Sequence, residues 1–172
     1  GLGMGRHHIQ RIVPAEHARL VGVCDANPER LKSVGDEFGV GWRTTEYEEL
    51  LARPDIDAVV VALPNFLHAP VTIAALQAGK HVLCEKPMAR TAAEAEQMLD
   101  ASRRADRRLM IHFNYRFTAP AVALHDFVQA GGLGDAYHAR SWWHRTRGIP
   151  GLGGWFTSKE RAGGGPLVDL GV

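Results

Sequence analysis

The sequence lacks the features that would place it in several protein classes. It has two cysteines, Cys24 and Cys84, and no CxxC pair, which leaves no zinc framework and favours a reducing compartment. The formal net charge is only +1, so no nucleic acid or anionic membrane partner is indicated. The longest apolar run, Ala58–Leu63, is far too short to cross a bilayer. These absences favour a soluble, cytoplasmic globular protein.

Both ends of the sequence look truncated. No initiator methionine precedes Gly1, and Val172 follows a glycine-rich stretch directly. We therefore expect a partial chain, and a signal segment before Gly1 stays open.

Short apolar runs alternate with helical segments over the first two thirds of the chain. The expected strands are Arg19–Cys24, Gly41–Arg43, Ala58–Leu63, His81–Cys84 and Leu109–Phe113. The expected helices are Arg6–Val13, Asn27–Phe38, Glu46–Ala52, Phe66–Ala78 and one capped by Thr91. The β-branched run at Ala58–Leu63 suggests burial on both faces. This alternation predicts an α/β fold with a doubly wound parallel sheet.

The pattern changes after Thr118. A helix is expected over Ala119–Gln129, followed by a longer, exposed strand over Ala136–Arg145 and a loop rich in glycine and tryptophan. We therefore expect one domain over residues 1–117 and the truncated beginning of a second, α+β domain over residues 118–172.

The first five residues, GLGMG, lead into the first expected helix. Glycines let a backbone approach a pyrophosphate, and a helix N-terminus offers free N–H groups. Asp25, which comes 20 residues after Gly5, is placed to accept the ribose hydroxyls and to repel a 2′-phosphate. The pattern indicates a dinucleotide, NAD rather than NADP, although the spacing is GxGxG and a plain glycine-rich turn stays open. The cofactor-binding candidates here are Gly1, Gly3, Met4, Gly5 and Asp25.

Polar residues follow the strand at Ala58–Leu63. Ligands of open α/β sheets lie outside the carboxyl ends of the strands, so Pro64, Asn65 and His68 are candidates for cofactor or substrate contact. The alternative is an asparagine that starts a helix and a histidine on the helix surface.

The next strand ends abruptly in Glu85-Lys86-Pro87. A lysine at this edge can donate a hydrogen bond to a substrate hydroxyl and stabilise its alkoxide as hydride leaves. The alternative is a structural pair between Lys86 and a carboxylate.

Near the C-terminus, three glycines precede a short apolar segment that carries Asp169. A carboxylate in apolar surroundings needs a partner or a function. Asp169 could orient a base or polarise a hydroxyl.

Together these motifs resemble one family, the glucose–fructose oxidoreductase and inositol dehydrogenase family, or Gfo/Idh/MocA. The resemblance rests on Glu85-Lys86-Pro87, on Pro64-Asn65 with His68, and on the GGGxLxDxG run at residues 163–171. Asn114-Tyr115-Arg116-Phe117 and Gly154-Trp155-Phe156 also resemble it. It implies a Rossmann domain that binds NAD(P), a substrate and oligomerisation domain, and hydride transfer with a sugar, cyclitol or related compound.

The resemblance also implies roles for individual residues. Lys86 matches the catalytic lysine, and Asp169 matches the acid four residues before a catalytic histidine, which would be residue 173. Glu85 and Lys86 would also contact the cofactor, and Asn114 and Arg116 the substrate. The first, central strand of the Rossmann sheet is absent from the sequence. We therefore expect the chain to be inactive alone and a homo-oligomer when complete.

Two other functions stay open. The protein could be a non-catalytic dinucleotide-binding sensor, although the presence of Lys86 and Asp169 argues against it. It could also be another two-domain dehydrogenase, such as a biliverdin-reductase-like or amino-acid-pathway enzyme. No metal is expected, because the nine histidines show no metal-binding spacing.

Overall fold

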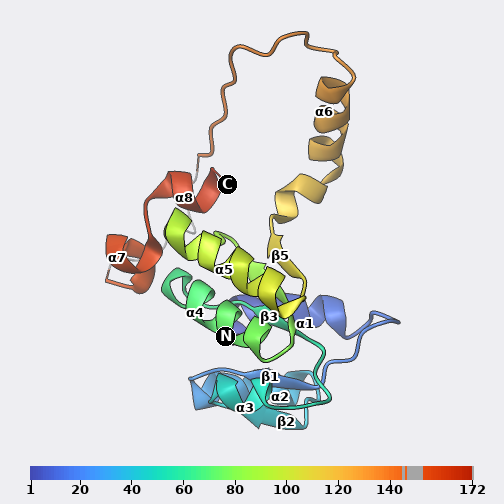
Figure 1. The fold of residues 1–172 in the computed structure, drawn as a ribbon, viewed down its shortest axis with the longest axis vertical. Helices are drawn as coiled ribbons and strands as arrows, with labels where there is room; N and C mark the ends of the chain where they lie inside the picture. The colour runs from blue at the N-terminus through green and yellow to red at the C-terminus, as the bar shows by residue number, and fades with distance from the viewer. Residues whose placement is uncertain (145, 147–152, 172) are drawn as a thin grey trace.

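The computed structural model describes residues 1–144, 146 and 153–171 (Figure 1). Strands and helices alternate over residues 22–112, as predicted. The strands are β1 (Gly22–Cys24), β2 (Trp42–Thr44), β3 (Ala58–Val61), β4 (His81–Glu85) and β5 (Leu109–His112). The α-helices are α1 (Leu2–Ile12), α2 (Pro28–Glu37), α3 (Tyr47–Leu51), α4 (Asn65–Gln77), α5 (Ala92–Ala105), α6 (Ala119–Gln129), α7 (Lys159–Ala162) and α8 (Pro166–Leu170). Two short 3₁₀ helices are η1 (Asn114–Phe117) and η2 (Trp155–Thr157).

The described strands form two parallel sheets, with strand orders β1-β2 and β3-β4-β5. These orders correspond to strands 2-3 and 4-5-6 of a doubly wound sheet of order 3-2-1-4-5-6. The predicted Rossmann-type α/β fold is therefore confirmed for the described residues.

Local sequence signals set several of the helix ends. The Asn27 side chain accepts hydrogen bonds from the backbone N–H groups of Glu29 and Arg30 and so caps α2. Thr91 accepts from the N–H of Glu94 and caps α5. After α4, Gly79 adopts a φ of +78°, a conformation that favours glycine at a helix end.

Helix α1 differs from its prediction, because it begins at Leu2 and not at Arg6. Gly3 and Gly5 therefore lie within the helix rather than in a turn before it. The reason is a tertiary contact: the Asp25 carboxylate, which follows β1, accepts the Leu2 N–H at 2.5 Å. A carboxylate from elsewhere in the chain thus satisfies a free donor at the first turn.

Two hydrophobic clusters form the interior. The larger packs α4 and α5 against β3 and β4, with Leu76, Cys84 and Met98 fully buried. The smaller packs α1 and α2 around Val23 of β1. Burial raises the pKa of the Cys84 thiol to about 12, which fits the behaviour of a small core residue.

The expected burial of the Ala58–Leu63 run on both faces is only partly right. Val61 is buried, but Val59 and Val60 are half-buried and Ala58 is exposed. One edge of β3 pairs with β4, and its other edge has no strand partner among the described residues. The start of this strand, beside the unpaired edge, is accessible to solvent.

The predicted strand over Ala136–Arg145 is wrong for residues 136–144, which form no regular element; Arg145 lies outside the described residues. A strand needs a neighbour to accept its backbone hydrogen bonds, and no described strand pairs with this segment. Helix α6 matches its prediction and buries no residue. It extends away from both sheets before the chain returns to α7 and α8 beside α4 and α5 (Figure 1). The domain boundary after residue 117 stays a prediction.

The two neighbours Met98 and Leu99 test which face of α5 is buried. Met98 is 0% exposed and Leu99 is 42% exposed. We expect Met98→Ala to lower the free energy of unfolding by about 2–5 kcal/mol, because it leaves a cavity. Leu99→Ala should cost less than about 1 kcal/mol. Urea unfolding of both variants measures this, and equal losses would contradict the packing of α5.

Candidate active site

The loops that follow β3, β4 and β5 lie at one edge of their sheet. All three strands run parallel, so their carboxyl ends coincide. Pro64 and Asn65 follow β3, Lys86 follows β4, and Asn114 follows β5. This edge is where the sequence predicted a site.

Lys86 reaches across this edge to the C-terminal segment. Its Nζ donates hydrogen bonds to the Asp169 carboxylate oxygen Oδ1 at 2.6 Å and to the Asp169 backbone oxygen at 2.8 Å. The two side chains are 28% and 27% exposed, so solvent and small molecules can reach them. The two predicted catalytic residues, 83 positions apart, are thus in direct contact.

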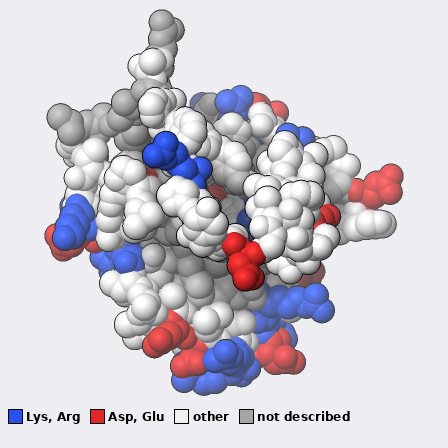
Figure 2. Space-filling view, turned by 90° about the horizontal axis from the view of Figure 1, so that it is seen from above, with Lys and Arg blue, Asp and Glu red and all other residues white. Residues whose placement is uncertain are grey.

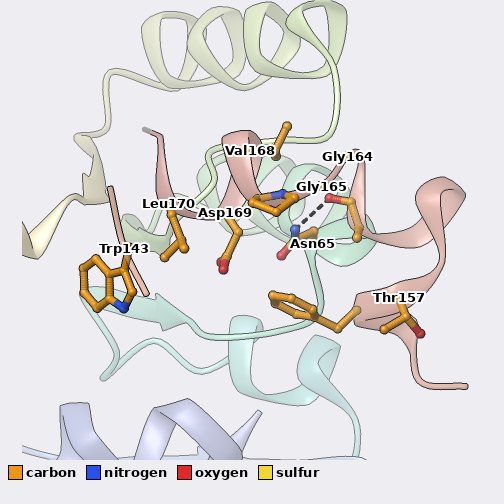
Figure 3. Close-up of a pocket in the computed structure, with 11 residues that line it drawn as sticks. Asn65, Trp143, Thr157, Gly164, Gly165, Val168, Asp169 and Leu170 are labelled. Carbon is orange, nitrogen blue, oxygen red and sulfur yellow. Dashed lines mark hydrogen bonds between the residues drawn. The ribbon is translucent and has the colours of Figure 1, made fainter. Parts of the chain in front are cut away.

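A cavity of about 430 Å³ opens beside Asp169 (Figure 3). Its walls come from the start of α4, from Trp143, and from the segment that runs through η2, α7 and α8. The lining residues are Asn65, Trp143, Phe156, Thr157, Ala162, Gly164, Gly165, Pro166, Val168, Asp169 and Leu170. Among the described lining residues, Asp169 is the only ionisable one. Of these walls, the family resemblance pointed to Phe156 through Gly154-Trp155-Phe156 and to residues 163–171 through the GGGxLxDxG run, whereas nothing in the sequence singled out Thr157.

Asn65 joins α4 to the C-terminal segment. Its buried side-chain amide donates a hydrogen bond to the Ala162 backbone oxygen at 2.8 Å, drawn as a dashed line in Figure 3. Pro64 directly precedes it as the N-cap of α4. Asn65 therefore lines the cavity and also fixes its wall.

His68 is neither a surface residue nor a cavity residue. It is 1% exposed, with Nδ1 at 2.7 Å from the Pro87 backbone oxygen and Nε2 at 2.8 Å from the Leu63 backbone oxygen. The ring thus holds the exits of β3 and β4 together. The expectation of a helix-surface histidine is wrong, and its expected contact with a ligand stays a prediction.

Glu85 does not pair with the adjacent Lys86 side chain. Its Oε1 lies 2.7 Å from His8 Nε2 and 3.0 Å from His112 Nδ1. Burial alone would raise the pKa of this carboxyl, but hydrogen bonds from the two histidines outweigh burial and hold the pKa below its ordinary value. The sequence did not associate these residues, because 77 and 27 positions separate the histidines from Glu85. All three are possible metal ligands, and their ligand atoms lie within 4.8 Å of one another.

The N-terminus of α1 offers the expected features of a pyrophosphate site. Gly1 lies against the end of β3, where an added Cβ would meet the Ala62 backbone oxygen at 2.7 Å. A Cβ on Gly3 would meet nothing within 4 Å, so a ligand can approach there. The N–H groups of Gly3 and Met4 lie in the first turn and have no acceptor within the helix. These residues fit a bound dinucleotide phosphate, whereas Gly5 is buried in the helix.

Asp25, the predicted ribose ligand, is 5% exposed, and its carboxylate already accepts hydrogen bonds from backbone N–H groups. It accepts the N–H of Leu2 at 2.5 Å and that of Asn27 at 2.8 Å, and Arg30 Nη1 lies 3.4 Å from it. Burial opposes its ionisation, but the two N–H donors and then Arg30 lower its pKa below the ordinary value.

Asn114 and Arg116, the predicted substrate contacts, lie in η1 and are exposed. The Arg116 guanidinium stacks over the Phe113 ring at 4.9 Å. Among the described residues, neither side chain is hydrogen-bonded to Lys86 or Asp169. Their substrate role stays a prediction.

Neither charge dominates the face of the molecule that Figure 2 shows. On the face in Figure 2, basic and acidic side chains are interspersed. None of the described helices is both long and apolar enough to span a membrane.

Parallel sheets with helices between the strands, preceded by a glycine-bearing helix, define a Rossmann-type α/β protein. Residues 1–113 match the Gfo/Idh/MocA oxidoreductase family, described as having an NAD-binding Rossmann fold. The chain belongs to this family.

Three similar proteins show what its relatives do. A 1,5-anhydro-D-fructose reductase from Ensifer adhaerens is 36% identical over 98% of this chain and 50% of its own length. An NAD-binding protein from Listeria innocua superposes with a TM-score of 0.84 at 31% identity, over 98% of this chain and 49% of that one. The WlbA dehydrogenase from Bordetella pertussis, solved with NADH and UDP-GlcNAcA, superposes with a TM-score of 0.72 at 32% identity, over 76% of this chain and 41% of that one. The chain spans about half the length of the curated relatives it matches.

The capping role of Asp25 predicts a pH dependence of stability. Its pKa is lower in the folded state, so its stabilisation is present above the ordinary value, about 4, and is lost as pH falls through the folded value. Asp25→Asn should therefore destabilise the protein at neutral pH and weaken the loss of stability as the pH falls below about 4. Urea unfolding across this range measures it, with the exposed Asp57→Asn as control. If the free energy of unfolding changed equally with pH in Asp25→Asn and in the unsubstituted protein, the capping role of Asp25 would be contradicted.

Proposed function

We propose that the protein is an NAD-dependent oxidoreductase that transfers hydride between the nicotinamide and a hydroxyl or carbonyl group of a sugar, cyclitol or related small molecule. The observation that carries the proposal is the contact of Lys86 Nζ with Asp169 Oδ1 at 2.6 Å, beside a cavity at the carboxyl edge of the sheet. The named relatives support it, since they include a 1,5-anhydro-D-fructose reductase and a dehydrogenase solved with NADH and UDP-GlcNAcA.

The proposed cofactor site is the N-terminus of α1. The free N–H groups of Gly3 and Met4 would hold the pyrophosphate, and Gly1 allows close approach to the end of β3. Bound NAD would supply the hydride acceptor or donor. Asp25 favours NAD over NADP, since its carboxylate would repel a 2′-phosphate.

Lys86 is the proposed group on the reacting oxygen. Oxidation of an alcohol removes a hydride from carbon and a proton from oxygen, so negative charge develops on that oxygen. The Lys86 ammonium can donate a hydrogen bond to it, because its Nζ already lies among acceptors at this edge. Lys86 therefore stabilises the alkoxide and orients the substrate.

Asp169 is proposed to support the proton transfer. Its carboxylate faces the cavity and accepts from Lys86, so it holds the ammonium toward the substrate. By resemblance to the family, a histidine four residues after Asp169 would take the proton. We further propose that residues 118–172 begin a substrate domain, because most of the cavity wall lies between Trp143 and Leu170.

The function is tested with the whole protein and a panel of sugars and cyclitols, each with NAD⁺ and with NADP⁺. We expect NADH formation with at least one member of the panel, and a higher kcat/KM for NAD⁺ than for NADP⁺. Tight NADH binding without turnover on any member would instead indicate a sensor.

Replacing the proposed catalytic lysine gives the sharpest mutational result. Lys86→Ala should lower kcat roughly a hundredfold or more, because a hydrogen bond to the developing alkoxide is lost. The Kd for NADH should change less than about twofold, since the pyrophosphate contacts lie on α1. The exposed Lys32→Ala is the matched control. An unchanged kcat in Lys86→Ala would show that Lys86 has no part in the mechanism.

A further inference from the structure

Three side chains from distant parts of the chain lie in contact with one another beside the backbone of Lys86. We name His8 of α1, Glu85 of β4 and His112 of β5 the Glu85 cluster. His8 Nε2 lies 2.7 Å and His112 Nδ1 3.0 Å from the same carboxylate oxygen, Oε1. The two imidazole rings are in edge-to-face contact, with centroids 4.8 Å apart. The cluster thus joins α1 to the ends of two neighbouring strands.

The chemistry of the cluster fixes the direction of each hydrogen bond. An ionised carboxylate can only accept, so His8 donates from Nε2 and His112 donates from Nδ1. Both donors use Oε1, which leaves Oε2 available. Oε2 accepts the backbone N–H of Lys86 at 3.2 Å. Glu85 therefore connects the two histidines to the main chain of Lys86.

Two of the three side chains of the cluster are shielded from water, and the third is partly exposed. The side chains of His8 and Glu85 are only 12% and 11% exposed, and that of His112 is 33% exposed. Hydrogen bonds to a shielded carboxylate are strong, and removal of one donor leaves the charge poorly compensated. The hydrogen bonds to Glu85 therefore connect α1 to the ends of β4 and β5.

We infer that His8 and His112 are positioning residues. They act through Glu85 to hold the Lys86 backbone at a fixed position relative to α1. The inference rests on the proposed function, since α1 is the proposed cofactor helix and Lys86 the proposed group on the reacting oxygen. The cluster then sets the lysine relative to the bound dinucleotide. His8 and His112 touch neither substrate nor reacting atoms in this role.

A metal ion is the competing occupant, because two histidines and a glutamate are common ligands. Both contacted nitrogens and both carboxylate oxygens are already engaged in hydrogen bonds within the protein. An ion would have to displace these bonds, so the positioning role accounts for more of the observed contacts.

The first test measures the Lys86 amide in the whole protein and needs no turnover. Hydrogen exchange at this amide, followed by NMR with ¹⁵N-lysine, should become faster by up to about tenfold in His8→Ala and in His112→Ala. Two conservative variants should keep the original rate: His8→Gln, whose amide nitrogen replaces Nε2, and His112→Asn, whose amide nitrogen replaces Nδ1. The exposed neighbour His7→Ala is the control. An unchanged Lys86 exchange rate in both alanine variants would overturn the inference.

The second test separates positioning from simple stability. His8→Ala and His112→Ala should each lower kcat by about tenfold while the Kd for NADH changes little. In a Lys86→Ala background the same substitutions should have almost no further effect on kcat, because they act through Lys86. Additive losses would contradict the inference, as would stoichiometric Zn²⁺ binding that His8→Ala abolishes and that raises kcat. If Lys86 exchange responds as expected but the unsubstituted protein never turns over, the proposed function fails and the positioning of the lysine backbone stands.

Discussion

The parallel pairing of β3, β4 and β5 is the constraint on which the candidate site depends. Parallel strands end at one edge, so loops that are distant in sequence open toward the same space. Lys86 leaves β4 at this edge and reaches Asp169, which the C-terminal segment brings back over α4. Asn65 holds that segment in place by donating a hydrogen bond to the Ala162 backbone oxygen. The sheet therefore places the lysine, whereas the C-terminal segment, held by Asn65, places the acid and most of the cavity wall.

Glu85 and Lys86 are adjacent in sequence, yet their side chains have separate partners. Glu85 turns toward α1 and β5, where two histidines compensate its charge. Lys86 turns toward α8 and the cavity. One residue thus anchors the loop while the other remains partly exposed. The acid and the base at the end of this apolar strand therefore have different roles. Glu85 fits the packing of the domain, and Lys86 fits the proposed chemistry.

Local signals allowed much of the fold to be predicted from the sequence. The caps at Asn27 and Thr91 and the turn at Gly79 act within a few residues, and the structure confirms them. The errors concern features that depend on distant partners. Helix α1 starts early because Asp25 caps it, and residues 136–144 form no strand because no described strand lies beside them. The partners of Glu85 and His68 could not be predicted either, since no spacing along the chain links them.

The central claim is that Lys86 exchanges its contact with Asp169 for one with the reacting oxygen of a sugar. A crystal structure of the whole protein with NADH and a sugar that it turns over tests this claim most directly. The account predicts Lys86 Nζ at about 3 Å from the reacting oxygen, with the nicotinamide against the adjoining carbon. A structure in which Lys86 still contacts only Asp169, while other groups hold the reacting oxygen, would contradict it.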